Sequence, residues 1–374
     1  MIIPFNKPLI LGNEQQHIAR VIDSGKISAK GNYNQKCSQL MDNIFSCRKT
    51  FLTSNCTSAL EMVTLLIDLK PEDEVIMPSF THVGTANPFL RTSAEIRWCD
   101  IREDTKNIDE KKIEELISVN AKAVVVVHYG GVSCQIEEIV EICRKHDLIL
   151  IEDCAMAIGS TWKNKPVGSF GDLAVVSFHD TKNIHCGEGG ALLINNPEML
   201  EKAEILINCG TNRTQFEQSK TDHYSWVAKS SNFQMSELQA AFLYPQLLEF
   251  KQINKNRLAT WDLFYTLLSE FWEIDQLPFV PKQCSHNAHL FYLILKTESH
   301  RKKLITHLSK AGISSVFHYI PLHSAPIWKD NCKSLPVTEK VASTILRLPM
   351  YYGFSKDEVK YIVQMIREFC DEEN

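Results

Sequence analysis

The fold is decided by residues 148–194, which read LILIEDCAMAIGSTWKNKPVGSFGDLAVVSFHDTKNIHCGEGGALLI. Three short apolar runs lie in this stretch, at 148–153, 173–178 and 190–194. Runs that are apolar on both faces are typical of strands in a sheet that helices cover on both sides. The stretch therefore predicts three buried strands, with polar residues gathered where the first two of them end.

Similar runs alternate with helical patterns over the first two-thirds of the chain. The other strands predicted there lie at 50–53, 74–77, 96–99 and 123–128, and a helix is predicted at 135–146. Such alternation favours an α/β domain with a mostly parallel sheet, which we place at residues 1–235.

The pattern changes after residue 235. A long helical stretch begins there, and Pro245 should kink it, because proline removes a hydrogen bond and clashes with the preceding turn. The elements expected next are a strand at 290–295, a helix at 299–311 and a strand near 314–320. We therefore expect a smaller α+β domain at residues 236–374.

The last helix of the chain has a clear start signal. Ser355, followed three residues later by Glu358, forms a capping box. One apolar stripe follows it, made of Val359, Ile362, Val363, Ile366 and Phe369.

Composition excludes several classes of function. The 374 residues carry 40 Lys and Arg against 45 Asp and Glu, a net charge of −5. No broad cationic surface is therefore available to bind nucleic acid or an anionic membrane. No run approaches the ~18 apolar residues of a spanning helix, and the first residues lack a signal-peptide pattern. We expect a cytoplasmic protein.

The twelve cysteines include no CxxC pair. The zinc and thioredoxin signatures are therefore missing, and we expect no metal site. In a reducing compartment the thiols should stay free.

The residues after the strand at 50–53 could hold a phosphate. Ser54 or Asn55 can cap a helix there, which leaves the N–H groups of residues 56–58 for an anion. Taken alone, an ordinary N-cap is the plainer interpretation of the same residues. No GxGxxG fingerprint follows this strand, so binding of a nicotinamide dinucleotide is disfavoured.

Two further strand ends carry polar groups. The strand at 148–153 ends in Glu152 and Asp153, which alternation places on opposite faces, so one of them can face a ligand. The strand at 173–178 leads into a short loop that holds Lys182 and precedes a glycine-rich turn. A turn residue and a solvated surface lysine are the plainer interpretations of these two positions.

A flat ligand surface is suggested by Phe80 and His82, which stand beside Thr81 and Thr85 after the strand at 74–77. Taken together, these features are a phosphate cup, a stacking surface, a strand-end carboxylate and a loop lysine. A planar phosphorylated aldehyde needs all four, because lysine forms the Schiff base and the carboxylate keeps a ring nitrogen protonated. The chemistry points to pyridoxal phosphate.

The sequence also resembles the DegT/DnrJ/EryC1/StrS family of sugar aminotransferases. The resemblance runs from IPFNKP near the start to RLPMYY at 347–352, and SFHDTKN followed by GEGGA after the ED strand is its strongest part. It implies the fold of type I pyridoxal phosphate enzymes, like aspartate aminotransferase. VIMPSFTHVGTAN, GTNRTQF, NAHLFY and VFHYIPLH are similar to a subgroup that aminates C4 of TDP-4-keto-6-deoxyglucose with L-glutamate.

The resemblance assigns roles to residues of this chain. Lys182 matches the Schiff-base lysine, and Asp153 matches the partner of the pyridine nitrogen. The other cofactor-binding positions are Cys56 and Thr57 in the phosphate turn, Ser177 beside the phosphate, and Asn232, which in relatives reaches the neighbouring subunit's phosphate.

Three positions depart from the family pattern. His82 stands where relatives have an aromatic ring that stacks on the cofactor, so its stacking could depend on pH. Met156 replaces the usual Gln or His near the ring and cannot donate a hydrogen bond. Gln234 replaces a common Arg.

The resemblance also implies the substrates and the assembly. A nucleotide sugar and L-glutamate are expected to bind in turn, in a homodimer with shared active sites, for O-antigen or related lipopolysaccharide biosynthesis. The galacto product is favoured. The expected substrate-binding residues are Arg213, for the diphosphate, and His318, Tyr319 and His323.

Other functions stay open. The same chemistry could give the gluco epimer or a 3-amino sugar. Sugar 3-dehydratases of the family replace the Schiff-base lysine with histidine, and Lys182 argues against that activity. A non-catalytic binding protein with this fold would not convert its cofactor with glutamate.

Overall fold

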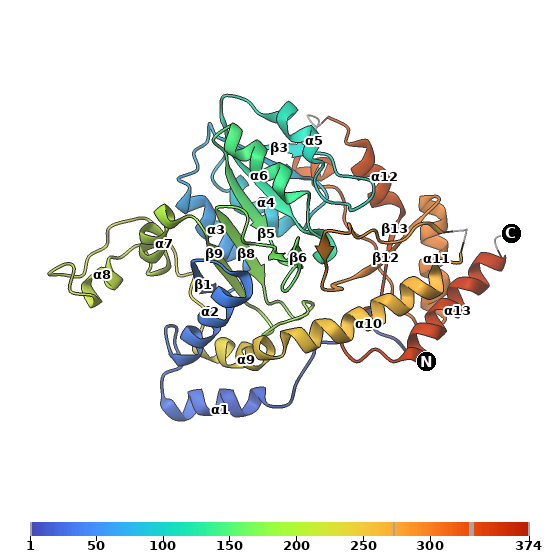
Figure 1. Cartoon of the computed structure of the whole chain (residues 1–374), viewed down its shortest axis with the longest axis horizontal. Helices are drawn as coiled ribbons and strands as arrows, with labels where there is room; N and C mark the ends of the chain where they lie inside the picture. Colours follow the sequence, from blue (N-terminus) through green and yellow to red (C-terminus); the bar gives the residue numbers. More distant parts are fainter. Residues whose placement is uncertain (1, 272–273, 329–332, 373–374) are drawn as a thin grey trace.

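A computed structural model describes residues 2–271, 274–328 and 333–372. A large α/β body lies at one end of the molecule and a smaller unit at the other, and helix α10 (Phe250–Leu268) runs between them (Figure 1). Both chain termini lie near the smaller unit. Among the described residues, no helix has the length and apolar character needed to cross a membrane.

The central sheet of the described chain has the strand order β1-β9-β8-β5-β4-β2-β3. Its strands are β1 (Lys49–Thr53), β2 (Glu74–Pro78), β3 (Glu95–Cys99), β4 (Ala121–Val127), β5 (Ile149–Asp153), β8 (Leu173–Ser177) and β9 (Gly190–Ile194). Of these, β9 alone is reversed, antiparallel to both β1 and β8. Each strand predicted for this part of the chain is confirmed, with ends that differ by at most two residues.

Helices bury both faces of this sheet, which explains why its strands are apolar throughout. On β9, Ala191 and Leu193 belong to one apolar cluster, with side chains of α2 and α9, whereas Leu192 and Ile194 belong to another, with side chains of α3 and α7. The helices are α1 (Glu14–Ser24), α2 (Asn32–Phe45), α3 (Cys56–Leu66), α4 (Val83–Leu90), α5 (Glu110–Ile113), α6 (Ile136–Lys145), α7 (Leu200–Ile207), α8 (Arg213–Glu217) and α9 (Glu237–Leu248). The helix predicted at 135–146 is confirmed as α6.

The smaller unit is built on an antiparallel sheet of β10 (Ile274–Gln276), β12 (Phe291–Leu295) and β13 (Ile345–Leu348). Its helices are α11 (Glu298–Lys310), α12 (Pro336–Thr344) and α13 (Lys356–Glu372). A second small sheet joins β11 (Cys284–Ser285) to β6 (Thr161–Trp162) and β7 (Lys165–Pro166) of the large body.

The capping box at the start of α13 is confirmed. The Ser355 amide donates to Glu358 Oε2 at 2.7 Å, and the Glu358 amide donates to Ser355 Oγ at 3.1 Å. The predicted apolar stripe of α13 lies in the core of the smaller unit.

One predicted strand is wrong. Residues 314–320 form no strand, and only Val316 makes a single bridge, to Arg347. The place beside β12 is taken by β13 instead, which pairs Tyr292 with Arg347. The segment at 314–320 contains β-branched and aromatic residues that favour strands, but its backbone pairs with another strand only at the bridge of Val316.

The long helix breaks later than expected. Pro245 lies buried inside α9, and its carbonyl still accepts the Glu249 amide at 3.2 Å, so the break falls at Glu249. The other buried apolar residues of α9, namely Ala240, Ala241, Leu243 and Leu247, share an apolar cluster with α2. The domain boundary at 235/236 stays a prediction.

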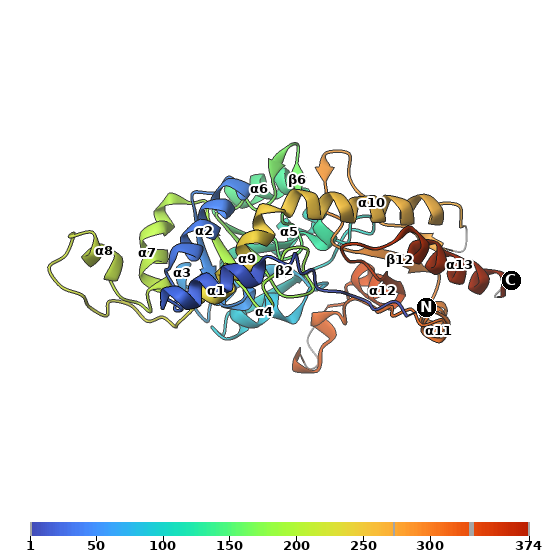
Figure 2. The same cartoon turned by 90° about the horizontal axis from the view of Figure 1, so that it is seen from below.

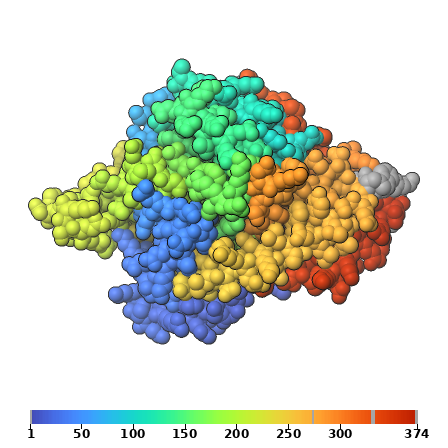
Figure 3. Space-filling view, in the orientation of Figure 1, coloured from blue at the N-terminus to red at the C-terminus, as the bar shows by residue number. Residues whose placement is uncertain are grey.

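A projecting arm leaves the large body after α7. It carries α8, lies at the far end of the molecule from the termini, and stands out from the surface in Figures 1, 2 and 3. None of the eleven cysteines within the described residues is in a disulfide, and Cys332 lies outside them.

Candidate active site

A cavity of about 730 Å³ lies at the carboxyl ends of β5 and β8, against the start of α3. Strand ends and a helix start meet there because parallel strands end at one edge of the sheet. The predicted site residues that line it are Cys56, Thr57, His82, Asp153, Met156, Ser177, Lys182, His318 and Tyr319. Residues from distant parts of the sequence therefore share one enclosure.

Asp153 is the last residue of β5 and lines this cavity. Its Oδ2 accepts a hydrogen bond from Thr85 Oγ1 at 2.9 Å, and its Oδ1 accepts from the Ala155 amide at 3.0 Å. Thr85 is itself held by Thr81, hydroxyl to hydroxyl, at 2.8 Å. The carboxylate thus has two donors, where a buried carboxylate can accept about four.

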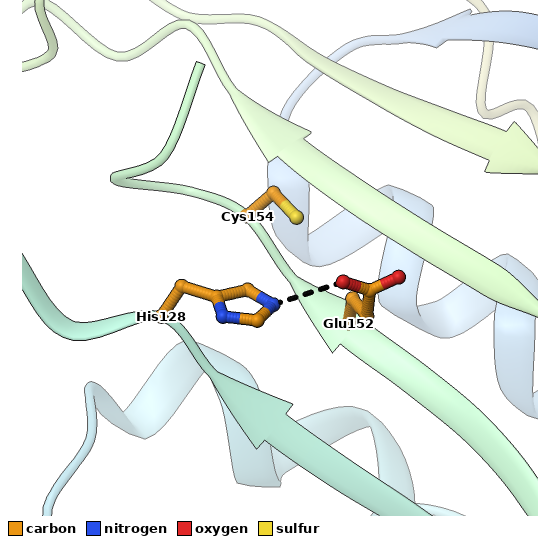
Figure 4. A group of neighbouring side chains, drawn as sticks. All are labelled: His128, Glu152 and Cys154. Atoms are coloured by element: carbon orange, nitrogen blue, oxygen red, sulfur yellow. Dashed lines mark hydrogen bonds and ion pairs between the residues drawn. The ribbon is translucent and has the colours of Figure 1, made fainter. Parts of the chain in front are cut away.

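Glu152, one residue earlier, lies on the opposite face of β5, as alternation predicts. Figure 4 shows its carboxylate pointing at His128, whose Nε2 lies 3.0 Å away. The same carboxylate accepts three backbone amides, from Gly168, Phe170 and Gly171, at 2.7–2.8 Å. These hydrogen bonds keep the pKa of Glu152 low in spite of its complete burial.

His128 and Glu152, with Cys154, also have the ligand atoms of a small metal site. The ligand atoms of the first two are already engaged, because His128 Nδ1 accepts the Cys134 amide at 3.1 Å while its Nε2 donates to Glu152. His128 and Glu152 therefore form a hydrogen-bonded support on one face of β5, and Cys154 lies beside them.

The start of α3 forms one wall of the cavity. Asn55 caps the helix by accepting the Ser58 amide at 2.8 Å, so the N–H groups left for an anion are those of Cys56 and Thr57. This corrects the expectation that the Ser58 amide is free as well. A Cβ on Gly190 would lie 2.4 Å from the carbonyl carbon of Asn55, so glycine lets β9 pass directly beneath the helix start.

Lys182 lies in the hairpin loop between β8 and β9. Its amide donates to the His179 carbonyl at 2.9 Å, and the next residue, Asn183, donates to Asn254 and to the Asn287 carbonyl. The lysine is thereby fixed at the base of the cavity. Burial lowers the pKa of its amine, which favours the neutral form.

The opposite wall is aromatic. His318 stacks on Tyr319, with ring centroids 3.8 Å apart and an interplanar angle of 18°. His82 caps α4, with its Nδ1 accepting the Gly84 amide at 3.0 Å, and its ring also lines the cavity. Burial lowers the pKa of His82, and the charge of Lys182 lowers it further.

Three predicted site residues are not brought to this cavity. Arg213 lies on α8, exposed and paired with Glu217 at 2.7 Å, and Asn232 is exposed on the large body. His323 is buried elsewhere, with its Nδ1 2.6 Å from Ser79 Oγ and its Nε2 3.2 Å from Glu339. The structure therefore gives His323 a structural role between the two parts of the chain.

Sequence reasoning missed Arg347, which lines the cavity from β13. Its signal was a lone cation between leucines in ILRL, residues 345–348. It also assigned no role to Thr85, whose hydroxyl contacts Asp153.

The residues present fit pyridoxal phosphate. The cavity combines a buried amine, a carboxylate with unused acceptor capacity, and a helix start with the hydroxyls of Thr57 and Ser58. Such a helix start favours an anion. Among these groups, Lys182 would hold the aldehyde carbon, Asp153 the ring nitrogen, and the turn at Cys56 and Thr57 the phosphate.

Comparisons with known proteins agree with this chemistry. Residues 8–367 match the model of the DegT/DnrJ/EryC1/StrS aminotransferase family. The spore coat polysaccharide biosynthesis protein SpsC of Bacillus subtilis is 30% identical, covering 98% of this chain and 96% of that protein. GDP-perosamine synthase of Escherichia coli O157:H7 is 28% identical, covering 98% of each.

A solved structure gives the same result for the fold. S. venezuelae DesV, solved in complex with a ketimine intermediate, is 26% identical, has a TM-score of 0.90 and covers 99% of each chain. The expected type I fold and its cofactor, pyridoxal phosphate, are therefore confirmed. This chain belongs to the DegT/DnrJ/EryC1/StrS aminotransferase family.

Proposed function

We propose that this protein transfers the amino group of L-glutamate to C4 of a nucleotide-linked 4-keto-6-deoxy sugar. The proposed substrate is TDP-4-keto-6-deoxyglucose, and the proposed products are the 4-amino-4,6-dideoxy sugar of galacto configuration and 2-oxoglutarate. The observation that carries the proposal is that Lys182 and Asp153 line the same cavity as the start of α3. A surface glycan role is supported by the spore coat polysaccharide protein SpsC.

Pyridoxal phosphate, when bound, supplies an electron sink for the carbon that loses a proton. Lys182 Nζ takes that proton and returns it, since burial makes the neutral amine available as a base. Asp153 keeps its charge beside the ring nitrogen and is held in place by Thr85. The aromatic wall of His318 and Tyr319 keeps the reacting atoms away from bulk water.

The first test is the visible spectrum of the purified holoenzyme with and without L-glutamate. Conversion of the cofactor band on adding glutamate is expected for the wild type, and Lys182→Ala should lose it. Absence of any cofactor band after addition of pyridoxal phosphate would overturn the proposal.

The second test identifies the sugar. The holoenzyme is first treated with L-glutamate, so that its cofactor carries the amino group. TDP-4-keto-6-deoxyglucose and its GDP-linked counterpart are then added separately, because one relative is a GDP-perosamine synthase. Nuclear magnetic resonance of the product then assigns the C4 configuration. Turnover of the GDP sugar alone would contradict the proposed substrate. An equatorial amine at C4, which is the gluco configuration, would contradict the proposed product.

We further propose that the active protein is a homodimer in which Asn232 and Arg213 serve the neighbouring subunit's cavity. The arm that carries α8 projects from the body (Figure 3), and Tyr224 and Trp226 on it are 54% and 76% exposed. Large aromatic surfaces of this kind are enriched at interfaces.

Light scattering and a mixing experiment test the dimer. Lys182→Ala and Asn232→Asp should each be inactive alone. Refolding them together should restore about a quarter of wild-type activity if the sites are shared, because half of the molecules carry one intact site of two. A monomer by light scattering, or no activity on mixing, would contradict the shared site.

A further inference from the structure

His289 lines the cavity that also holds Lys182, and it comes from the segment that leads into β12. It belongs to the stretch NAHLFY at 287–292, to which the proposed function assigns no role. The residue is buried, and its carbonyl accepts the guanidinium of Arg257 on α10 at 2.6 Å. His289 is therefore a fixed part of the cavity wall.

The orientation of Asn183 decides which nitrogen of the His289 ring carries a proton. Asn183 Nδ2 lies 2.9 Å from the carbonyl oxygen of Asn287, and a backbone carbonyl only accepts, so this end of the side chain is the donating amide nitrogen. Its Oδ1 then faces His289 Nδ1 at 3.0 Å and must accept from it. His289 Nδ1 is therefore the nitrogen that carries the proton.

The other ring nitrogen, Nε2, is left as an acceptor. Burial and the nearby charges of Lys182, Arg257 and Arg347 hold the pKa of His289 well below its ordinary value, so the ring is neutral. A neutral ring with its proton on Nδ1 has none on Nε2. Among the described residues, none donates a hydrogen bond to this atom. The cavity wall thus offers an unused acceptor.

Lys182 lacks the complementary partner. Within the described chain its Nζ has no hydrogen-bond acceptor, and burial lowers the pKa of the amine. The carboxylate of Asp153 is already held by two donors and is the group proposed for the ring nitrogen. The other charged or titratable groups near enough to interact with this amine are Cys56, His82, His289, His318 and Arg347. A donor and an acceptor that both lack partners therefore share one cavity.

We propose that His289 Nε2 accepts a hydrogen bond from Lys182 Nζ whenever the lysine is not joined to the cofactor. The inference rests on the proposed function and makes His289 a positioning residue for its base. The proton taken from the donor carbon stays on Nζ, which then has three N–H groups. One of them is held by His289, and another remains to be returned. Because the lysine stem has four rotatable bonds, fixing its end keeps the amine aimed at the reacting carbon.

A neutral acceptor suits this task better than a carboxylate. A carboxylate beside Nζ would raise the pKa of the amine and retain the proton, whereas the base must give the proton back. An imidazole accepts the hydrogen bond without adding a charge. Asn183, the residue after Lys182, binds the other side of the same ring, so the ring and the lysine are tied to one loop.

Two substitutions separate the two ring nitrogens. His289→Asn has a short amide that can still donate to Asn183, but it has no group at the position of Nε2. His289→Gln places an amide oxygen near that position and loses the donor to Asn183. A purely structural role predicts that asparagine is the milder change, whereas the positioning role predicts that glutamine is.

The first measurement is the ionisation of Lys182 in the protein freed of its cofactor. Labelling with acetic anhydride over a range of pH, followed by mass spectrometry of the peptides, gives the midpoint at which the amine loses its proton. His289→Asn should lower this midpoint by about one pH unit, because the ammonium loses an acceptor, and His289→Gln should shift it by less than about half a unit. Exposed Lys163 is the internal standard, and His146→Asn, at the end of α6, is the control variant.

The second measurement uses the holoenzyme and L-glutamate alone. The rate at which saturating glutamate converts the cofactor band should fall about 10-fold in His289→Asn, within the range for losing a hydrogen bond to a charged group. The half-saturating glutamate concentration should change by less than about threefold, because the contact is made to the base and not to the donor. His289→Gln should keep at least about a third of the wild-type rate.

Thermal unfolding checks each variant. If His289→Asn does not fold, His289→Gln is compared with His289→Leu, since both lose the bond to Asn183 and only glutamine carries an acceptor. In that comparison, the leucine variant should show the lower midpoint and the slower conversion.

Three results would overturn the inference. The first is a wild-type midpoint and rate in His289→Asn, and the second is a glutamine variant as slow as the asparagine or leucine variant. The third is a change confined to the half-saturating concentration of the keto-sugar nucleotide, which would assign Nε2 to that substrate. Failure of the wild type to respond to glutamate would remove the proposed function, whereas labelling of the cofactor-free protein would still decide whether His289 holds Lys182.

Discussion

The two faces of β5 carry carboxylates one residue apart, and they are treated in opposite ways. Glu152 accepts three backbone amides and the His128 ring, so its acceptor capacity is used up inside the protein. Asp153 accepts one hydroxyl and one amide and lines a cavity. A saturated buried group stabilises the fold, whereas an undersatisfied one is left for a ligand.

The largest effect is expected on the cavity face. Asp153→Asn should lower kcat by a factor on the order of 10²–10³, because it removes the fixed charge beside the cofactor nitrogen. The free energy of unfolding of the apoprotein should change little, because Oδ1 can still accept the Ala155 amide and the Thr85 hydroxyl can rotate to accept from the new N–H₂. Steady-state kinetics and urea unfolding measure the two effects, and near-normal kcat would break the comparison.

A substitution on the opposite face of β5, at Glu152, should change the stability of the protein and leave its activity unchanged. Glu152→Gln places an amide N–H₂ against backbone N–H groups and leaves donors unsatisfied, so the free energy of unfolding should fall by about 3 kcal/mol. Activity per folded molecule should stay near wild type. Glu137→Gln, at an exposed pair with Lys163, is the matched control and should leave the free energy of unfolding near the wild-type value. An equal loss in both variants would contradict the support role of Glu152.

A smaller effect is expected when Asp153 loses one of its two partners. Thr85→Val removes the hydroxyl that donates to Oδ2 and keeps the shape of the side chain. The loss of one such hydrogen bond is worth about 1 kcal/mol, which corresponds to about a fivefold fall in kcat. Thr85→Ser should restore most of it. If the serine variant is as slow as the valine variant, packing and not the hydroxyl matters at this position.

The smallest effect concerns pH. Burial lowers the pKa of His82 below its ordinary 6.5, so the ring is neutral at and above pH 7. A group with a lowered folded-state pKa stabilises the protein above the unfolded-state pKa, and that contribution is lost as pH falls through the folded-state value. His82→Phe should therefore flatten the acid side of the plot of unfolding free energy against pH. At pH 8 it should change kcat by less than about fivefold. An unchanged acid limb would show that His82 does not titrate there.

Much of the large body could be predicted from the sequence because its signals are local. The doubly buried strands are apolar throughout, and alternation alone placed Glu152 and Asp153 on opposite faces. Lys182 could be recognised as a candidate site residue for a similar local reason, because it stands in a loop that directly follows a buried strand.

The rest depended on contacts that no local pattern carries. His323 looks like a ligand-binding histidine in its motif, yet its partner Ser79 lies 244 residues away. Arg347 was missed because β13 has four residues and follows α12 without a turn residue between them. Arg213 has a clear motif, but it lies on an exposed arm outside the cavity, and its proposed role in a neighbouring subunit stays a prediction.

The reversed strand β9 limits how this protein can change in length. Gly190 pairs with Ser177 on one side and Thr53 on the other, beneath the start of α3. One residue added to the loop at 178–189 would shift the register of β9 and turn every side chain of the strand to the other face. Loss of one residue from the same loop would instead bring Ala191 to the place beside Asn55, where a Cβ does not fit. Insertions among relatives should therefore collect in the arm around α8 and spare the loop that carries Lys182.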